Sequence, residues 1–258
     1  APLTAGSTTS VASATFQVIH GAAHHIAISR QASGATAGNI FATQPIVQVQ
    51  DIENHVVTDG NLSGSSIQVS VSTGGTLVGT TTIVAVNGIA RFTDLGLSGL
   101  KATYTLTFEG LNTGFSTVTQ SLALGYGNAD RLVVTTEPVG GHATGAAFTT
   151  APVVKVYDAY GNVVENSTAT ITATVASGDG NATLHAGSSK AAVAGVASFS
   201  ALRLVGTPLQ NYSLAFASTG LTGATSQSFS VTHAPASQLV WVTQPHGTNM
   251  TGEDLDGQ

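Results

Sequence analysis

The acidic residues are the side chains of this sequence best suited to bind a ligand, and that ligand would be calcium. Calcium takes roughly six to eight oxygen ligands, many of them from carboxylates. Asp51, Glu53 and Asp158 lie in two expected turns, and Asp130 lies near an expected domain junction. None of them has the Asp-x-Asp-x-Asp-Gly spacing of a calcium loop. We prefer the interpretation that Asp158 caps its turn. Calcium at these four residues is the alternative, and no other cofactor is expected.

Histidine is the other residue type that could bind a metal, and the chain has eight. His24 and His25 are adjacent, and neighbours along a strand point to opposite faces, so we do not expect them to bind one ion together. We interpret all eight as scattered surface side chains. The chain has no cysteine, which excludes disulfides, iron–sulfur clusters and thiolate zinc sites.

The sequence contains no motif of a known catalytic or nucleotide-binding site. A Gly-x-Ser-x-Gly elbow, a phosphate loop and a dinucleotide fingerprint are all missing, and no paired carboxylates stand out. We therefore predict that the protein is not an enzyme. Its net charge of −6, with no basic run, argues against a nucleic-acid partner. No run of roughly 18 apolar residues is present, so we expect no membrane span in this fragment.

Two stretches of the chain carry the same pattern. Residues 151–164 place alternating valines before Asp158 and then Gly161 and Asn162, which is the pattern of a half-buried strand followed by a turn. Residues 45–57 repeat it, with Pro152 lying 107 positions after Pro45. Residues 88–92 and 195–199 repeat at the same distance. The chain is therefore predicted to contain two copies of one structural unit.

Each unit is predicted to be an antiparallel Greek-key β-sandwich without helices. In the second unit we expect strands near residues 131–136, 151–157, 168–176, 181–185, 190–194, 196–200, 211–217 and 225–232. The first residues of the penultimate strands, Tyr104 and Tyr212, are expected to pack inward and bond nearby backbone. The predicted core includes the following residues: Val47, Val49, Phe92, Leu97, Tyr104, Leu106, Val154, Val156, Phe199, Leu204, Tyr212 and Leu214.

The repeats also predict the domain boundaries. We expect one domain over residues 24–128 and a second over 129–235, joined by a short junction around residues 127–130. Residues 1–23 are interpreted as the closing strand of a preceding repeat, because residues 13–19 match the closing strands of both units. Residues 236–258 are interpreted as the opening strand of a following repeat. Calcium at the junction would lie nearest Asp130.

Four motifs together resemble the tandem immunoglobulin-like repeats of large bacterial and archaeal cell-surface proteins. The motifs are residues 132–138, 152–164, 195–199 and 212–214. Such repeats occur in invasin-like adhesins and in surface-layer and sheath proteins. The first unit departs from the pattern, because Asn54 and His55 stand where the second has Gly161 and Asn162.

The resemblance implies an extracellular, non-catalytic protein at the cell surface. It would act as a spacer or as a building block of a surface layer, sheath or fibre. Its partners would be other copies of itself or neighbouring repeats, joined through β-strand edges. The alternative is an adhesin module that binds carbohydrate or a receptor on a host surface through loops or strand edges.

Overall fold

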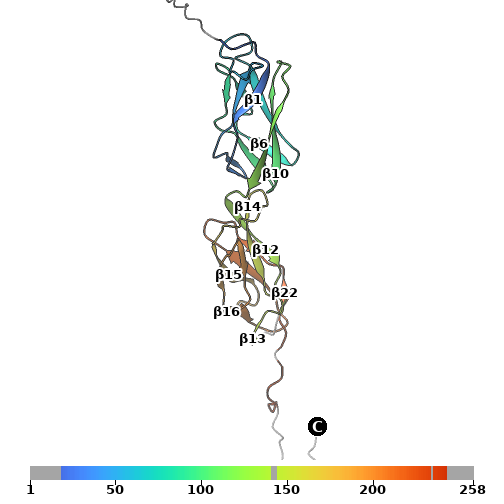
Figure 1. The fold of residues 1–258 in the computed structure, drawn as a ribbon. Coiled ribbons are helices and arrows are strands. Elements are labelled where there is room, and N and C mark those ends of the chain that lie inside the picture. The colour runs from blue at the N-terminus through green and yellow to red at the C-terminus, as the bar shows by residue number, and fades with distance from the viewer. Residues whose placement is uncertain (1–18, 141–143, 234, 243–258) are drawn as a thin grey trace, which may run out of the picture.

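The computed structural model describes residues 19–140, 144–233 and 235–242, and these residues form an all-β protein (Figure 1). Its buried hydrophobic residues form two separate clusters. The first cluster runs from Ile26 to Leu124 and defines domain 1, and the second runs from Leu132 to Val231 and defines domain 2. The two domains follow one another end to end (Figure 1). No helix in the described ranges is long and apolar enough to cross a membrane.

Domain 1 is a two-layer sandwich with a small third sheet. One layer has the order β1 (His25–Arg30), β4 (Ile46–Gln50) and β8 (Ile89–Arg91). The other has the order β2 (Ala35–Thr36), β11 (Val118–Gly125), β10 (Thr103–Gly110), β5 (Ser66–Val71) and β7 (Thr82–Val84). The third sheet joins β3 (Asn39–Ile40), β9 (Gly96–Gly99) and β6 (Gly75–Val78). This order is that of an immunoglobulin-like Greek-key sandwich.

Domain 2 repeats this order almost strand for strand. One layer has the order β12 (Ala129–Thr136), β14 (Val153–Asp158) and β18 (Val196–Ser198). The other has the order β17 (Ser189–Ala191), β15 (Thr170–Ser177), β20 (Asn211–Ala217) and β21 (Ala224–Thr225), and β22 (Phe229–Ser230) also pairs with β20. The third sheet joins β13 (Thr144–Ala147), β19 (Arg203–Val205) and β16 (Thr183–His185). The predicted fold class is confirmed. The sequence did not predict β13 and β19, because these short strands lack a clear alternation.

The predicted core is also confirmed. All twelve of its residues are buried, and the most exposed of them, Tyr104, retains 5% of its surface. In β14 the side chains of Val154, Val156 and Asp158 are buried while those between them are partly exposed. The Tyr104 hydroxyl donates to the Leu100 carbonyl at 2.8 Å, and that of Tyr212 donates to the Thr207 carbonyl at 2.9 Å. Both tyrosines therefore have the predicted structural role.

The segment after domain 2 differs from the prediction. Residues 238–242 form no strand, and Leu239 is fully exposed, whereas Leu132, at the corresponding position of β12, is paired with Val156 and 3% exposed. A strand needs a neighbour for its backbone hydrogen bonds, and among the described residues no strand or bridge pairs with this segment. The predicted strand at residues 13–19 lies, apart from Ile19, outside the described residues.

Candidate functional site: the junction between the domains

The connection between the domains is short. β11 ends at Gly125 and β12 begins at Ala129, so three residues join the two sandwiches. A connection of this length leaves little freedom to the domains. The polar contacts around it determine how rigid the junction is.

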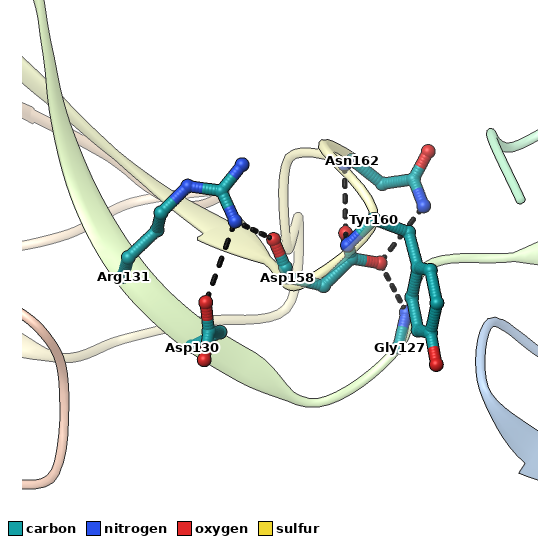
Figure 2. Close-up of polar contacts among 6 residues, drawn as sticks. All are labelled: Gly127, Asp130, Arg131, Asp158, Tyr160 and Asn162. Carbon is teal, nitrogen blue, oxygen red and sulfur yellow. Dashed lines mark hydrogen bonds and ion pairs between the residues drawn. The ribbon is translucent and has the colours of Figure 1, made fainter.

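Asp158, at the end of β14, is the centre of these contacts, and its side chain is fully buried. Its Oδ1 accepts hydrogen bonds from the backbone N–H groups of Tyr160 at 2.9 Å and Asn162 at 2.8 Å. Its Oδ2 accepts from the Gly127 N–H at 2.7 Å and from Nδ2 of Asn162 at 2.8 Å (Figure 2). Asp158 therefore caps its turn, as predicted, and also binds the connection itself.

The environment of Asp158 keeps its carboxylate charged. Burial raises the pKa of this group, but the hydrogen bonds from Gly127, Asn162 and Tyr160 outweigh burial, so the pKa lies below its ordinary value. Hydrogen bonds to a carboxylate are roughly twice as strong as those between neutral groups. The charge therefore strengthens the contact between the turn and the connection.

Asn162 extends this network into domain 1. Its Oδ1 accepts from the Lys101 backbone N–H at 2.7 Å, and its Nδ2 donates to the Gly99 carbonyl at 3.1 Å. Nζ of Lys101 lies 2.8 Å from a carboxylate oxygen of Glu165 and 5.9 Å from the centre of the Tyr126 ring. Both members of this ion pair are about half exposed, so the pair contributes no more than roughly 1 kcal/mol. Asn162, which is buried, is the stronger link.

Tyr160 packs against a glycine of domain 1. Gly38 has a φ of +80°, and a Cβ atom built on it would overlap the Tyr160 hydroxyl. Only glycine combines this backbone conformation with room for the ring. Gly38 therefore allows the turn of domain 2 to approach domain 1 closely.

Domain 1 contains the same network at its opposite end. Oδ1 of the buried Asp51 accepts hydrogen bonds from the backbone N–H groups of Glu53 at 3.1 Å and His55 at 2.8 Å. Its Oδ2 accepts a hydrogen bond from the Gly21 N–H group at 2.7 Å and lies 3.2 Å from Nδ1 of His55. Burial raises the pKa of Asp51, but the hydrogen bonds from Gly21 and His55 and the charge of His55 outweigh burial and lower the pKa to about 2. Asn54 adopts a φ of 70° where Gly161 has 92°. The turn is therefore retained although its sequence differs.

The structure places the four calcium candidates in three locations. Asp51 and Glu53 lie together with His55, with ligand atoms within 4.8 Å of one another, and they form the one such group in the described part of the chain. Asp158 lies in the junction, while the carboxylate of Asp130 faces Arg131 at 3.4 Å (Figure 2). The oxygens of Asp51 and Asp158 already accept N–H groups, so a cation would have to displace these donors. Calcium binding stays a prediction.

The adjacent histidines differ from expectation. Their Nδ1 atoms lie 3.4 Å apart and their rings meet edge to face, so the prediction that they point to opposite faces is wrong. His24 precedes β1, so the alternation of a strand does not apply to it. Both side chains lie at the surface, where the contact between the two rings satisfies one nitrogen of each.

The sequence did not predict the residues that cross the junction. Lys101 and Asn162 lie 61 residues apart in the chain, and no local pattern relates them. Gly38 likewise carries no sequence signal beyond its repeat partner Gly145. The one available signal was Asn162 itself, whose turn position was identified without its contact to domain 1.

The fold and the junction define an all-β protein of stacked immunoglobulin-like domains. No family model and no curated protein matches the chain. Among solved structures it is similar to a β-glucuronidase of Parabacteroides merdae (13% identity, TM-score 0.28, 80% of this chain and 24% of that one). It is also similar to a β-glycosidase of Bacteroides vulgatus (8% identity, TM-score 0.33, 80% of this chain and 24% of that one). A third similar structure is the D0-D1 domain of Intimin (13% identity, TM-score 0.30, 80% of this chain and 98% of that one). The chain spans about a quarter of each glycosidase, and at these TM-scores the likeness carries no functional argument.

Proposed function

We propose that this chain is a non-catalytic structural element of an extracellular surface protein. Its immunoglobulin-like domains are held in a fixed orientation and act as a spacer or as a building block of a surface layer, sheath or fibre. The observation that carries the proposal is the Asp158–Asn162 network. It joins the connection, the turn of domain 2 and the loop of domain 1 in one set of hydrogen bonds.

The composition of the chain fits this role. Only 8% of residues are charged, and the junction relies mainly on amide groups rather than on exposed ion pairs. Hydrogen bonds between buried amides and a buried carboxylate are screened by salt much less than surface charges are. Such a junction would keep its geometry over a wide range of ionic strength, which suits a protein outside the cell.

The adhesin alternative has no specific observation in its favour. A carbohydrate-binding face would present clustered exposed aromatic rings. In the described part of the chain the large exposed aromatics are Tyr160, which packs at the junction, and Trp241, which follows domain 2. These two residues do not form a common face.

The proposal is tested by the rigidity of the junction in solution. Small-angle scattering and NMR residual dipolar couplings are measured for the wild type and for Asn162→Ala. We expect one fixed domain orientation in the wild type and a broader distribution in the variant. The matched control is Asn166→Ala, an exposed asparagine of the same turn region, which should behave like the wild type. A wild type with independently moving domains would overturn the proposal.

The same measurement tests calcium. Addition of a chelator should leave the maximum dimension unchanged if the amide network alone holds the junction. A contraction that calcium reverses would instead support the predicted cation site.

A further inference from the structure

His20 lies immediately before Gly21, the residue that binds the turn of domain 1. The His20 side chain retains only 14% of its surface, so the expectation of a surface side chain is wrong for this histidine. Its Nδ1 lies 2.8 Å from the Gly21 carbonyl oxygen, which can only accept a hydrogen bond. Nδ1 therefore carries a hydrogen, and in a neutral imidazole ring Nε2 then has a lone pair and no hydrogen.

Nε2 of His20 faces a second acceptor. Oδ1 of Asp59 lies 3.0 Å from it, but the two atoms form no hydrogen bond. Among the buried side-chain nitrogen and oxygen atoms of residues 19–140, 144–233 and 235–242, this Nε2 is the one without a hydrogen-bond partner. Buried polar atoms are nearly always paired, and a lone pair and a carboxylate oxygen repel each other unless a positive charge lies beside both. The pair therefore points to a bound cation.

A hollow beside the pair has room for this cation. It has a volume of about 540 Å³, and its lining includes His20, Asp59 and Asn61. A water molecule takes about 30 Å³, so the hollow accommodates an ion together with water ligands. The side chain of Asp59 is 86% exposed, so it can turn towards an ion without disturbing the core.

Domain 2 has the same hollow at the junction without this pair. In each connection a glycine binds the aspartate of the following turn, so Tyr126 occupies the position of His20. Asn166 lies 107 residues after Asp59, and both Tyr126 and Asn166 line the junction hollow, whose volume is about 290 Å³. Domain 1 thus has an imidazole and a carboxylate, two common metal ligands, where domain 2 has a phenol and an amide. The fold itself does not require the pair.

We propose that His20 and Asp59 bind a first-row transition-metal dication, with water molecules in the hollow as its further ligands. An imidazole nitrogen suits zinc, copper, iron and nickel, whereas calcium prefers oxygen ligands. Two bonds of about 2.1 Å at a right angle place their ligand atoms about 3.0 Å apart, which matches the separation of Nε2 and Oδ1. The Gly21 carbonyl fixes the tautomer and orientation of the ring, as acceptors behind metal-binding histidines commonly do.

The ion attaches the segment before β1 to domain 1 at a second point. The Gly21 N–H group already binds Asp51, and the ion adds a link from His20 to the loop that contains Asp59. Two points of attachment fix the direction of the segment, whereas one leaves rotation about it. Removal of the metal should therefore loosen residues 19–21 without unfolding domain 1, whose core is formed by other residues.

Cobalt provides the test, because Co²⁺ takes nitrogen and oxygen ligands and its unpaired electrons shift nearby NMR signals. The full chain is freed of metal with a chelator and titrated with Co²⁺ at neutral pH by calorimetry and amide NMR. We expect one site, with the largest shifts at Gly21 and Gly60. Loss of a residue that merely orients a metal ligand costs roughly 10–100-fold in affinity, so His20→Ala should weaken binding by at least about tenfold. Asp59→Asn, at an exposed position where the fold is not at risk, should also weaken it.

His24→Ala is the matched control, because His24 is a nearby exposed histidine that contacts His25 and does not line the hollow. It should leave the affinity unchanged, and an excess of Ca²⁺ should not displace Co²⁺. Equal affinities of the wild type and His20→Ala, shifts centred on His24 or His55, or displacement by calcium would overturn the proposal. Absence of binding at millimolar Co²⁺ would also overturn it and leave a proton as the positive charge on Nε2. The junction lies at the other end of domain 1, so none of these outcomes bears on the proposed function.

Discussion

Replacement of Asp158 by asparagine should destabilise domain 2 because one oxygen replaces two. The carboxylate accepts four N–H groups, two on each oxygen. The asparagine amide nitrogen would face one of these pairs and leave two buried donors without an acceptor. Each such donor costs roughly 1–3 kcal/mol, so with partial relaxation we expect a loss of about 2–4 kcal/mol in the free energy of unfolding.

The assay is urea unfolding followed by circular dichroism, with hydrogen exchange at Gly127 as a local measure. Asp130→Asn is the matched control. It is an aspartate of the same junction, but its carboxylate is partly exposed and faces only Arg131, so the change should stay within roughly 0.5 kcal/mol. Equal effects of the two substitutions would refute the assignment of Asp158 as the centre of the junction.

The remaining predictions concern each domain separately. Because the pKa of Asp51 is about 2 instead of 3.8, its charge stabilises domain 1 above about pH 4, and this contribution is lost as the pH falls towards 2. The urea midpoint of domain 1 should therefore fall with pH in this range, and Asp51→Asn should remove this dependence on pH. Ala194 has a φ of +50°, as does Asn87 at the corresponding position, so Ala194→Asn should raise the unfolding free energy by roughly 1 kcal/mol and Asn87→Ala should lower it. Phe199→Ala should destabilise domain 2 by roughly 3–5 kcal/mol in the same assay, since the ring is buried against Phe216; a change below 1 kcal/mol would contradict its place in the core.

The sequence was sufficient to predict the fold because its signals are local and occur twice. The alternating valines of residues 151–157 specify which face of β14 is buried, and residues 45–50 repeat the pattern in β4. The Phe and Leu residues that follow occur at matching positions in both units. A hydrophobic position that occurs in both units at one spacing reports the core more reliably than either copy alone.

The short strands were harder to predict because they depend on their neighbours. β2 has two residues and pairs in parallel with β11, and β13 contains Gly145 at positive φ. Neither segment has an alternation long enough to indicate a strand. Their backbone groups are paired because the completed sandwich places a partner beside them, and that placement is a property of the whole domain.

Of the candidate site, only the contacts within the turn after Asp158 could be predicted from the sequence. Asp158 was identified as a turn cap because an aspartate bonds the amides that follow it within a few residues. Its bond to Gly127 and the contact of Asn162 with Lys101 join segments 31 and 61 residues apart. These contacts depend on how one domain sits on the next, so neither unit alone specifies them.

The turns after Asp51 and Asp158 show which residues the turn geometry requires. Asn54-His55 and Gly161-Asn162 differ at both positions, yet in both the first residue has positive φ and the second donates its N–H group to the preceding aspartate at 2.8 Å. The aspartate and the backbone conformation therefore set the geometry, and both His55 and Asn162 fit at the second position. That residue is also the one that faces a neighbouring domain at the junction. A change at this position can therefore alter the contact with the neighbouring domain while the aspartate still holds the turn.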